Sequence, residues 1–482
     1  MIYQKTLVML AALLTALAPM AASAQGISLL RDAEMEEFLY DYSNPLFKVA
    51  GLPENSIKIL IVNDGSFNAF AGGRYMGVNT GLLTTADTPN QVEAVLAHEV
   101  GHLAGGHTAR TGDAIAAASR PMLLSLLLAA GAIAAGAPDA GLAVLGLGQT
   151  VGTANFLKYS RGQEATADQS SITYLDKVGH SSKGALEIWT KLRNRQIITG
   201  NRINPYFLTH PLANQRLTAL RTRAEASPYY DVEDSPAEIE RLHYIQAKIY
   251  GFLHDPNATL RKYPLTDQSG PAHYARAVAY FRVAKIDQAL SEVRTLTELY
   301  PNNAYFHELE GQILFEFGRT NEAIEPHRQS IALKSDNALL RINLGRALLA
   351  SGEPILIEEA AKEFRRALLL ENDNAFGWFE LARAYGALDN EPMAMLATAE
   401  SRYHGGAPGE ANSFARRAIV RLERGSPEWR QAADVILATQ PKGAAAPLPP
   451  GVETSPPPQT PEPVKLPDEG QDVPDPTFAG GR

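Results

Sequence analysis

The chain has 482 residues, with 44 Lys and Arg against 53 Asp and Glu, and it contains no cysteine. This length is too great for one hydrophobic core, because domains usually have about 100–200 residues. The formal net charge of −9 disfavours a nucleic-acid-binding protein, which would normally carry a basic surface. The absence of cysteine excludes disulfides, thiolate metal sites and thiol nucleophiles, so any metal must be held by nitrogen and oxygen atoms.

Residues 1–24 have the pattern of an export signal. Lys5 supplies a positive charge, an apolar run follows it, and Ala22-Ser23-Ala24 is a small-residue cleavage site. A membrane anchor is the alternative, but the apolar run is shorter than the about 20 residues that a span needs. We therefore predict a signal peptide that is cleaved near Ala24 and a protein of the bacterial periplasm.

Residues 25–230 mix strand-like and helical patterns and are predicted to form one domain. Residues 58–83 alternate apolar and β-branched runs with Gly and Asn, which predicts a small sheet. Residues 90–110 carry apolar residues at helical spacing. Residues 121–148 are very apolar, and we expect a pair of buried short helices there. The alternative is an exposed hairpin that makes peripheral contact with a membrane or with an unfolded client.

The predicted helix at 90–110 contains the sequence His98-Glu99-Val100-Gly101-His102. Residues four apart lie on one face of a helix, so both imidazoles can reach a single zinc ion. Glu99 is then placed beside the position left open for water. Because this HExxH pattern also occurs by chance in unrelated helices, a third ligand is needed to support a metal site. Catalytic zinc keeps three protein ligands and one exchangeable water.

Two known patterns could supply the third ligand. A metzincin needs a histidine six residues after the second histidine of the motif, but position 108 is Thr and the nearest histidine is His107. A thermolysin-like site instead takes a Glu from a later helix. Glu164 begins a helical run in which Asp168 follows one turn later, so a carboxylate from this second helix completes a site without cysteine.

Residues 237–440 show a repeat with a spacing of 34. Small residues recur at one position and larger residues three positions later: Ala277, Gly311 and Gly345, then Tyr280, Leu314 and Leu348. This pattern resembles the tetratricopeptide repeat (TPR), in which small residues let paired helices approach closely. We predict an α-solenoid of TPR hairpins with a concave binding face. Residues 441–482 contain 12 of the 31 prolines and are expected to be a disordered tail.

Four segments taken together resemble the HtpX/CAAX-prenyl-protease family of metallopeptidases. They are the HEVGH motif with His107 five residues later, RGQEATAD, NAFAGGRYMGVNTGLL and THPLANQRL. The resemblance implies a fold that is mostly α with a small β-sheet, a gluzincin-like metalloprotease domain followed here by the TPR solenoid. It also implies one zinc ion per chain, with His98, His102 and Glu164 as ligands and Glu99 as the catalytic base.

The resemblance implies roles for further residues. Asp168 matches a position assigned in the family as a proton donor, although it equally fits a carboxylate that orients a metal ligand. His210 could hydrogen-bond the tetrahedral intermediate, or it could bind zinc as a fourth ligand and hold the enzyme latent. Asn68 and Ala69 match the family's edge strand, which holds a substrate backbone by strand addition, although an internal strand is the alternative.

Members of the family that combine an export signal with TPR repeats suggest a more specific function. The resemblance implies a periplasmic zinc endopeptidase that acts in outer-membrane protein assembly and quality control, with a chaperone-like role. Its partners would be unfolded or stalled outer-membrane proteins and their assembly machinery, bound through the TPR domain. The alternative is a TPR scaffold or chaperone whose protease domain is largely silent.

Overall fold

A computed structural model describes residues 28–53, 56–110, 138–198 and 214–440, together with positions 119, 123–126, 128, 206 and 210. The predicted export signal, most of residues 121–137 and the predicted tail at 441–482 lie outside these residues. The chain divides into two compact units, Met1–Ala350 and Ser351–Arg482. The boundary predicted near residue 237, between a protease domain and a repeat domain, stays a prediction.

A small mixed sheet forms where the sequence predicts one. Its strands are β1 (Leu29–Leu30), β2 (Lys58–Val62), β3 (Ala69–Gly72) and β4 (Tyr75–Asn79). They lie in the order β1-β2-β4-β3, with β2 and β4 parallel and the other two pairs antiparallel. Within the described residues, strand β3 therefore lies at an edge of the sheet, where the resemblance places the strand that holds substrate.

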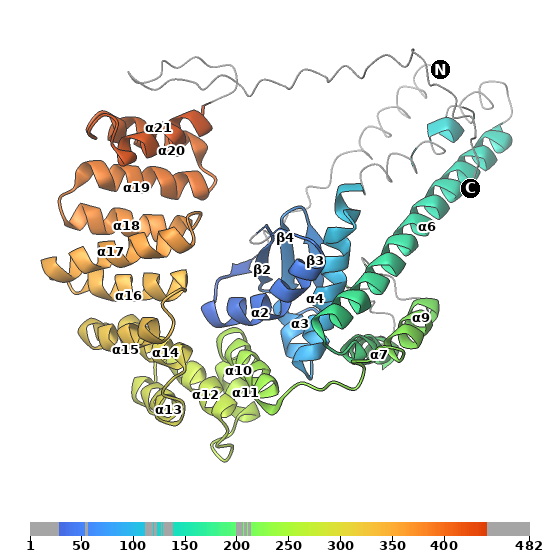
Figure 1. The fold of residues 1–482 in the computed structure, drawn as a ribbon, viewed down its shortest axis with the longest axis horizontal. Coiled ribbons are helices and arrows are strands. Elements are labelled where there is room, and N and C mark those ends of the chain that lie inside the picture. The colour runs from blue at the N-terminus through green and yellow to red at the C-terminus, as the bar shows by residue number, and fades with distance from the viewer. Residues whose placement is uncertain are drawn as a thin grey trace, which may run out of the picture. The chain divides into compact units, whose positions relative to one another are not determined.

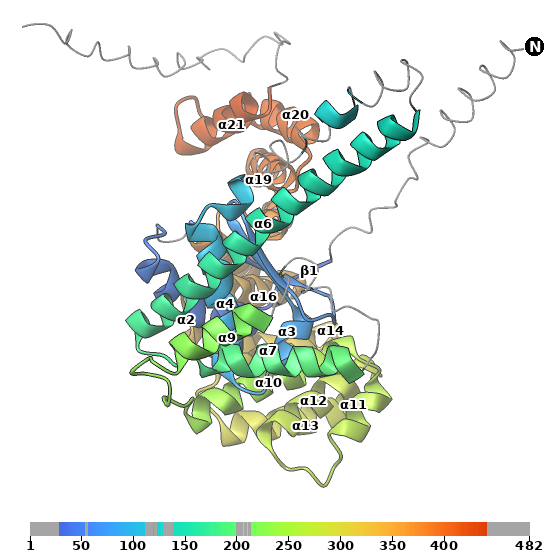
Figure 2. The same ribbon diagram turned by 90° about the vertical axis from the view of Figure 1, so that its right-hand side faces the viewer.

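The remaining elements around this sheet are helical. They are α2 (Ala33–Val49), α3 (Thr80–Thr85), α4 (Pro89–Ala104), α6 (Pro138–Val178), α7 (Lys183–Ile198) and α9 (Asn214–Ala224). Helix α4 begins at Pro89, and the Thr88 side chain caps it by accepting a hydrogen bond from the Gln91 amide. Every residue from Pro89 to His102 is buried, and α4 packs against α6 and α7 (Figures 1 and 2).

Helix α6 changes the interpretation of the apolar segment 121–148. Residues 138–148 are the first turns of this single 41-residue helix, which continues through Glu164 and Asp168. Leu123, Leu124 and Leu147 are 60%, 59% and 66% exposed. The expectation of two buried short helices is therefore wrong for the described part of this segment. No helix among the described residues combines the length and apolar character needed to cross a membrane.

The predicted helical hairpins of the repeats are present. In the first unit they are α10 (Pro236–Leu253), α11 (Pro256–Lys262), α12 (Gly270–Arg282), α13 (Ile286–Leu299), α14 (Ala304–Glu316), α15 (Thr320–Leu333) and α16 (Ala338–Ala350). In the second unit they are α17 (Pro354–Leu370), α18 (Ala375–Ala387), α19 (Glu391–His404), α20 (Pro408–Ile419) and α21 (Pro427–Ala438). Gly311 of α14 shows why a small residue recurs, because a Cβ there would lie 2.7 Å from the His327 ring of α15.

Helix α2 explains why the first unit extends to residue 350. Near its start, Glu34 accepts hydrogen bonds from Lys248 of α10 at 3.2 Å and from Tyr274 of α12 at 2.8 Å. One turn later, Glu37 pairs with Lys334 at 2.6 Å. These buried and half-buried contacts tie the N-terminal helix to the first repeats, so α10–α16 share a unit with the sheet and α4.

Candidate metal centre

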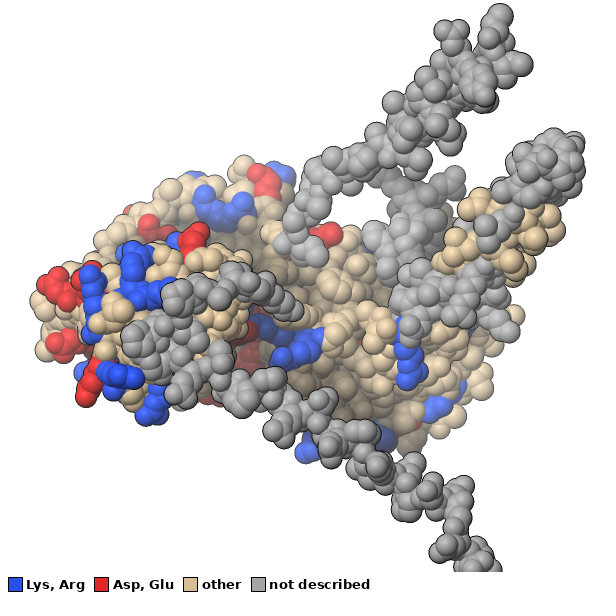
Figure 3. Space-filling model, turned by 90° about the horizontal axis from the view of Figure 1, so that it is seen from above, with Lys and Arg blue, Asp and Glu red and all other residues tan. Residues whose placement is uncertain are grey.

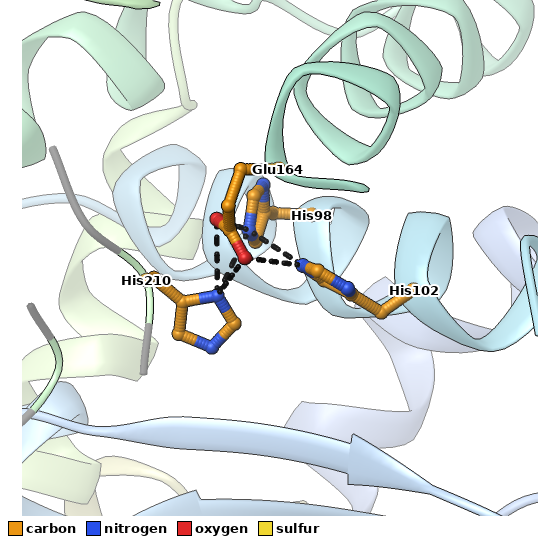
Figure 4. A group of neighbouring side chains, drawn as sticks. All are labelled: His98, His102, Glu164 and His210. Carbon is orange, nitrogen blue, oxygen red and sulfur yellow. Dashed lines mark hydrogen bonds and ion pairs between the residues drawn. The ribbon is translucent and has the colours of Figure 1, made fainter. Parts of the chain in front are cut away.

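Helix α4 places three of the predicted site residues in the interior. His98, Glu99 and His102 are all buried, and the two histidines lie one turn apart on the same helix face. Their Nε2 atoms are 3.1 Å apart (Figure 4). Two buried imidazoles therefore direct nitrogen atoms at one point.

Helix α6 brings Glu164 to the same point. Its carboxylate oxygens lie 3.4 Å from His98 Nε2 and 3.4 Å from His102 Nε2. Gly101, inside the HExxH motif, makes this close packing of α4 and α6 possible, because a Cβ there would lie 2.9 Å from the Ala167 carbonyl oxygen. A side chain at position 101 would thus push Glu164 away from the histidines.

His210 completes the group from outside both helices. Its Nδ1 atom is 3.0 Å from Glu164 Oε1 and 3.4 Å from His98 Nε2 (Figure 4). Its Nε2 atom is 3.5 Å from Glu99 Oε1. The ring stacks on Tyr206 with a centroid distance of 4.5 Å, which fixes its orientation. One ligand atom from each of His98, His102, Glu164 and His210 lies within 4.8 Å of the others.

This donor set fits a zinc ion. Zinc bound tetrahedrally at about 2.0–2.1 Å places its ligand atoms about 3.3 Å from one another. Burial lowers the pKa of His102 to about 2, so its neutral imidazole offers a lone pair, whereas for His98 burial is outweighed by the acidic neighbours Asp168 and Glu164, which raise its pKa to about 10. Zinc would therefore have to displace a proton from His98. Both carboxylate oxygens of Glu99 are buried, and among the described residues neither has a hydrogen-bond partner. The nearest basic neighbour of this carboxylate is His210, whose Nε2 atom lies 3.5 Å from Glu99 Oε1 without meeting the criteria of a hydrogen bond, so the buried carboxylate keeps the capacity to bind a further group.

Two side chains support the ligands from behind. Asp168 Oδ1 lies 3.1 Å from His98 Nδ1, on the side of the ring away from Glu164. Arg216 of α9 donates to both Asp168 oxygens, at 2.7 and 2.9 Å, and its third nitrogen lies 2.9 Å from Glu164 Oε2. Arg216 therefore contacts both Glu164, a predicted metal ligand, and Asp168, the carboxylate that contacts the second ligand His98. In the sequence, only the position of Arg216 within the THPLANQRL segment indicated that this residue belongs to the site.

The predicted substrate-binding residues lie at the start of the edge strand. The Asn68 carbonyl accepts a hydrogen bond from the Asn79 amide at 3.0 Å, and Ala69 is the first residue of β3. Asn68 Oδ1 is buried and has no hydrogen-bond partner among the described residues. The preceding residue, Phe67, packs edge-to-face on Tyr206 at 5.4 Å, and Tyr206 in turn stacks on His210. The structure thus brings the edge strand and the metal centre together.

Comparison with known proteins agrees with this geometry. Residues 33–224 match Peptidase family M48. The chain is 28% identical over 410 residues to the beta-barrel assembly-enhancing protease of Escherichia coli (strain K12), which covers 83% of this chain and 81% of the relative. It is 25% identical over 412 residues to the protein of the same name from Yersinia pestis, covering 83% and 82%. It is 30% identical over 190 residues to metalloprotease YcaL of Escherichia coli (strain K12), covering 38% of this chain and 70% of the relative.

Proposed function

The chain belongs to peptidase family M48 and is a metallopeptidase, and from this premise we propose that it is a periplasmic zinc endopeptidase acting on unfolded or stalled outer-membrane proteins. The buried group of His98, His102 and Glu164, with Glu99 beside it, is the observation that carries the proposal. An enzymatically silent scaffold would not need to keep a buried carboxylate, with no basic neighbour among the described residues closer than the 3.5 Å contact from His210 Nε2, next to these ligands.

We assign the chemical roles as follows. His98, His102 and Glu164 would hold zinc, which lowers the pKa of bound water towards about 7 and polarises a carbonyl group. Glu99 accepts the proton of the attacking water and delivers it to the leaving amine. Burial raises the pKa of Glu99, which makes this carboxylate a stronger base. Asp168 contacts His98 Nδ1, so we propose that it orients this ligand and does not donate a proton to the substrate.

For His210, the geometry favours the role of a fourth ligand that keeps the enzyme latent. Its Nδ1 atom lies 3.0 Å from Glu164 Oε1 and 3.4 Å from His98 Nε2, so it would take the fourth position that an exchangeable water otherwise fills. We expect His210→Ala to raise kcat/KM for an unfolded protein about tenfold or more, because the fourth position becomes open. His243→Ala, which removes an exposed histidine of α10, should leave the rate unchanged. A lower rate for His210→Ala would instead assign this residue to stabilisation of the intermediate.

The substrate backbone is proposed to add to β3, the edge strand among the described residues. An extended peptide can satisfy the unpaired backbone groups of an edge strand, and this recognition tolerates many sequences. Broad recognition of this kind suits an enzyme whose substrates are unfolded chains.

The partners are proposed from the relatives and from the repeat helices. The relatives named beta-barrel assembly-enhancing protease match 83% of this chain, including the repeats. We propose that the TPR helices bind outer-membrane proteins or their assembly machinery and add a chaperone-like activity.

Figure 3 shows Lys and Arg interspersed with Asp and Glu on the face drawn there, without one broad basic surface. The periplasmic location depends on the predicted signal at residues 1–24.

Helix α18 offers a place to test this recruitment. It exposes Phe376 and Phe379, which are 48% and 46% exposed and stack on each other. A photo-crosslinking residue at position 376 or 379 of the full chain should capture an unfolded outer-membrane protein. The same residue at Tyr229, which is 38% exposed and lies outside the repeat helices, should not. Equal capture from all three positions would contradict recruitment by the repeats.

A further inference from the structure

A pocket in the second unit is lined by residues of helices α17, α18 and α21. Its volume is about 550 Å³, within the range of about 300–1,000 Å³ that is usual for ligand sites. Three of the lining residues are the cations Lys362, Arg365 and Arg366 of α17, and all three are exposed. Lys362 lies three and four positions before the two arginines, so the three side chains share one face of the helix. The pocket therefore concentrates positive charge.

This positive charge is not cancelled within the pocket. Arg366 pairs with Glu363, but Glu363 is buried and does not line the pocket. Arg365 donates a hydrogen bond of 3.4 Å to the Tyr385 hydroxyl, and within the described residues neither Arg365 nor Lys362 has an ion-pair partner. No Asp or Glu is among the described residues that form the lining. A negatively charged occupant would therefore complement this pocket.

The same pocket also has an apolar surface that is open to an occupant. Leu369 of its lining is 86% exposed, and Trp378 is half-buried. The Trp378 indole N–H donates to the Asn372 carbonyl at 2.8 Å, which fixes the ring. Grooves lined by aromatic rings bind proline-rich segments, and clusters of arginine bind acidic ones. The combined lining favours a segment that is both proline-rich and acidic.

The chain itself contains such a segment after its last helix. Residues 466–478, LPDEGQDVPDPTF, have four acidic residues and three prolines, no Lys or Arg, and an aromatic residue at the end. The tail that contains them begins just after α21, the helix from which Gln431 lines the pocket. The roughly 28 residues from Gln440 to Asp468 can span up to about 90 Å, so the segment can return to the pocket.

We propose that this pocket binds residues 466–478 of the chain's own tail. The carboxylates of the segment pair with Lys362 and Arg365, and its Pro and Phe side chains cover Trp378 and Leu369. Because the segment is tethered, its effective concentration at the pocket is on the order of millimolar, so even a weak affinity is sufficient. A partner that uses this pocket must first displace the tail. The inference does not depend on the proposed proteolysis.

A photo-crosslinking residue at position 369 of the full chain tests the proposal, because this position is exposed at the pocket. After irradiation and digestion, mass spectrometry should find the main crosslink with residues 466–478 of the same chain, at a yield that does not change on dilution. Lys362→Glu combined with Arg365→Glu should lower this yield about fivefold or more, because like charges then face each other. Replacing the four acidic residues of the segment with Lys in that variant should restore the yield.

Arg417→Glu combined with Arg424→Glu is the matched control and should keep the original yield. Both cations are exposed in the same unit, and neither lines the pocket. If the variant with reversed charges in α17 does not fold, amide replacements of the four acids in the otherwise unchanged chain should give the same loss. A main crosslink to a second copy or to another part of the chain would overturn the proposal, as would a yield that ignores both charge changes. Capture of an added unfolded outer-membrane protein alone, and never of the tail, would make the pocket a client site and also overturn it.

Discussion

Replacing Glu99 with Gln is expected to lower kcat/KM for an unfolded outer-membrane protein by about 10²–10⁴-fold, the usual contribution of a general base. Glutamine fills the same buried space beside His98 but cannot accept a proton. Because Glu99 is not assigned as a zinc ligand, zinc content measured by mass spectrometry should stay at the wild-type value. The change would therefore separate metal binding from catalysis.

Glu93→Gln is the matched control for this experiment. Glu93 is also buried in α4, but it pairs with His180 at 2.6 Å, away from the metal centre. The same chemical change at this position should leave kcat/KM close to that of the wild type, although some stability is lost with the pair. Equal losses of activity from both substitutions would show that any disturbance of α4 inactivates the enzyme and would contradict the role assigned to Glu99.

Replacing Arg216 with Gln is expected to have the largest effect on stability. Arg216 is 8% exposed and contacts Asp168 and Glu164 together, so its loss removes one cation from two buried carboxylates. Breaking a buried ion pair in this way usually costs about 3–5 kcal/mol of unfolding free energy. Loss of the residues that orient metal ligands typically weakens metal affinity by about 10–100-fold. Urea denaturation and competition with a zinc chelator measure the two effects.

Arg221→Gln on the same helix is the control for Arg216. Arg221 and its partner Glu225 are 53% and 50% exposed, and their side chains are 3.6 Å apart. An exposed pair of this kind contributes less than about 1 kcal/mol. If Arg216→Gln were as mild as Arg221→Gln in both measurements, the ionic support of the metal centre would not matter.

Local spacing was sufficient to predict the part of the metal centre that lies on one helix. His98 and His102 share a face because they are four residues apart, and this is a property of any helix. The approach of Glu164 depends on the packing of α4 on α6 at Gly101, which no spacing rule describes. Arg216 was not assigned a role, because its partner Asp168 is 48 residues away and only the folded chain brings them together.

In the fold, too, features set by neighbouring residues could be predicted, and features set by contacts between distant segments could not. The 34-residue period predicted the helical hairpins, since each hairpin is set by its own sequence. The place of β3 at the edge could not be decided, because strand order depends on pairing between segments that are not adjacent in sequence. The first repeats share a unit with the sheet because Glu34 and Glu37 of α2 bind cations over 200 residues away, which periodicity does not reveal.

The most direct test of a one-zinc peptidase is a titration of the metal-free chain with zinc while cleavage of an unfolded outer-membrane protein is followed. The His210→Ala chain suits this measurement, because removing the proposed fourth ligand would leave the fourth coordination position open. We predict that the rate rises in proportion to added zinc and stops rising at one equivalent per chain, and that the same chain with Glu99→Gln stays inactive throughout. Cleavage by the metal-free chain, or no cleavage at full zinc occupancy, would contradict the assignment of His98, His102 and Glu164 as the ligands of a catalytic zinc ion.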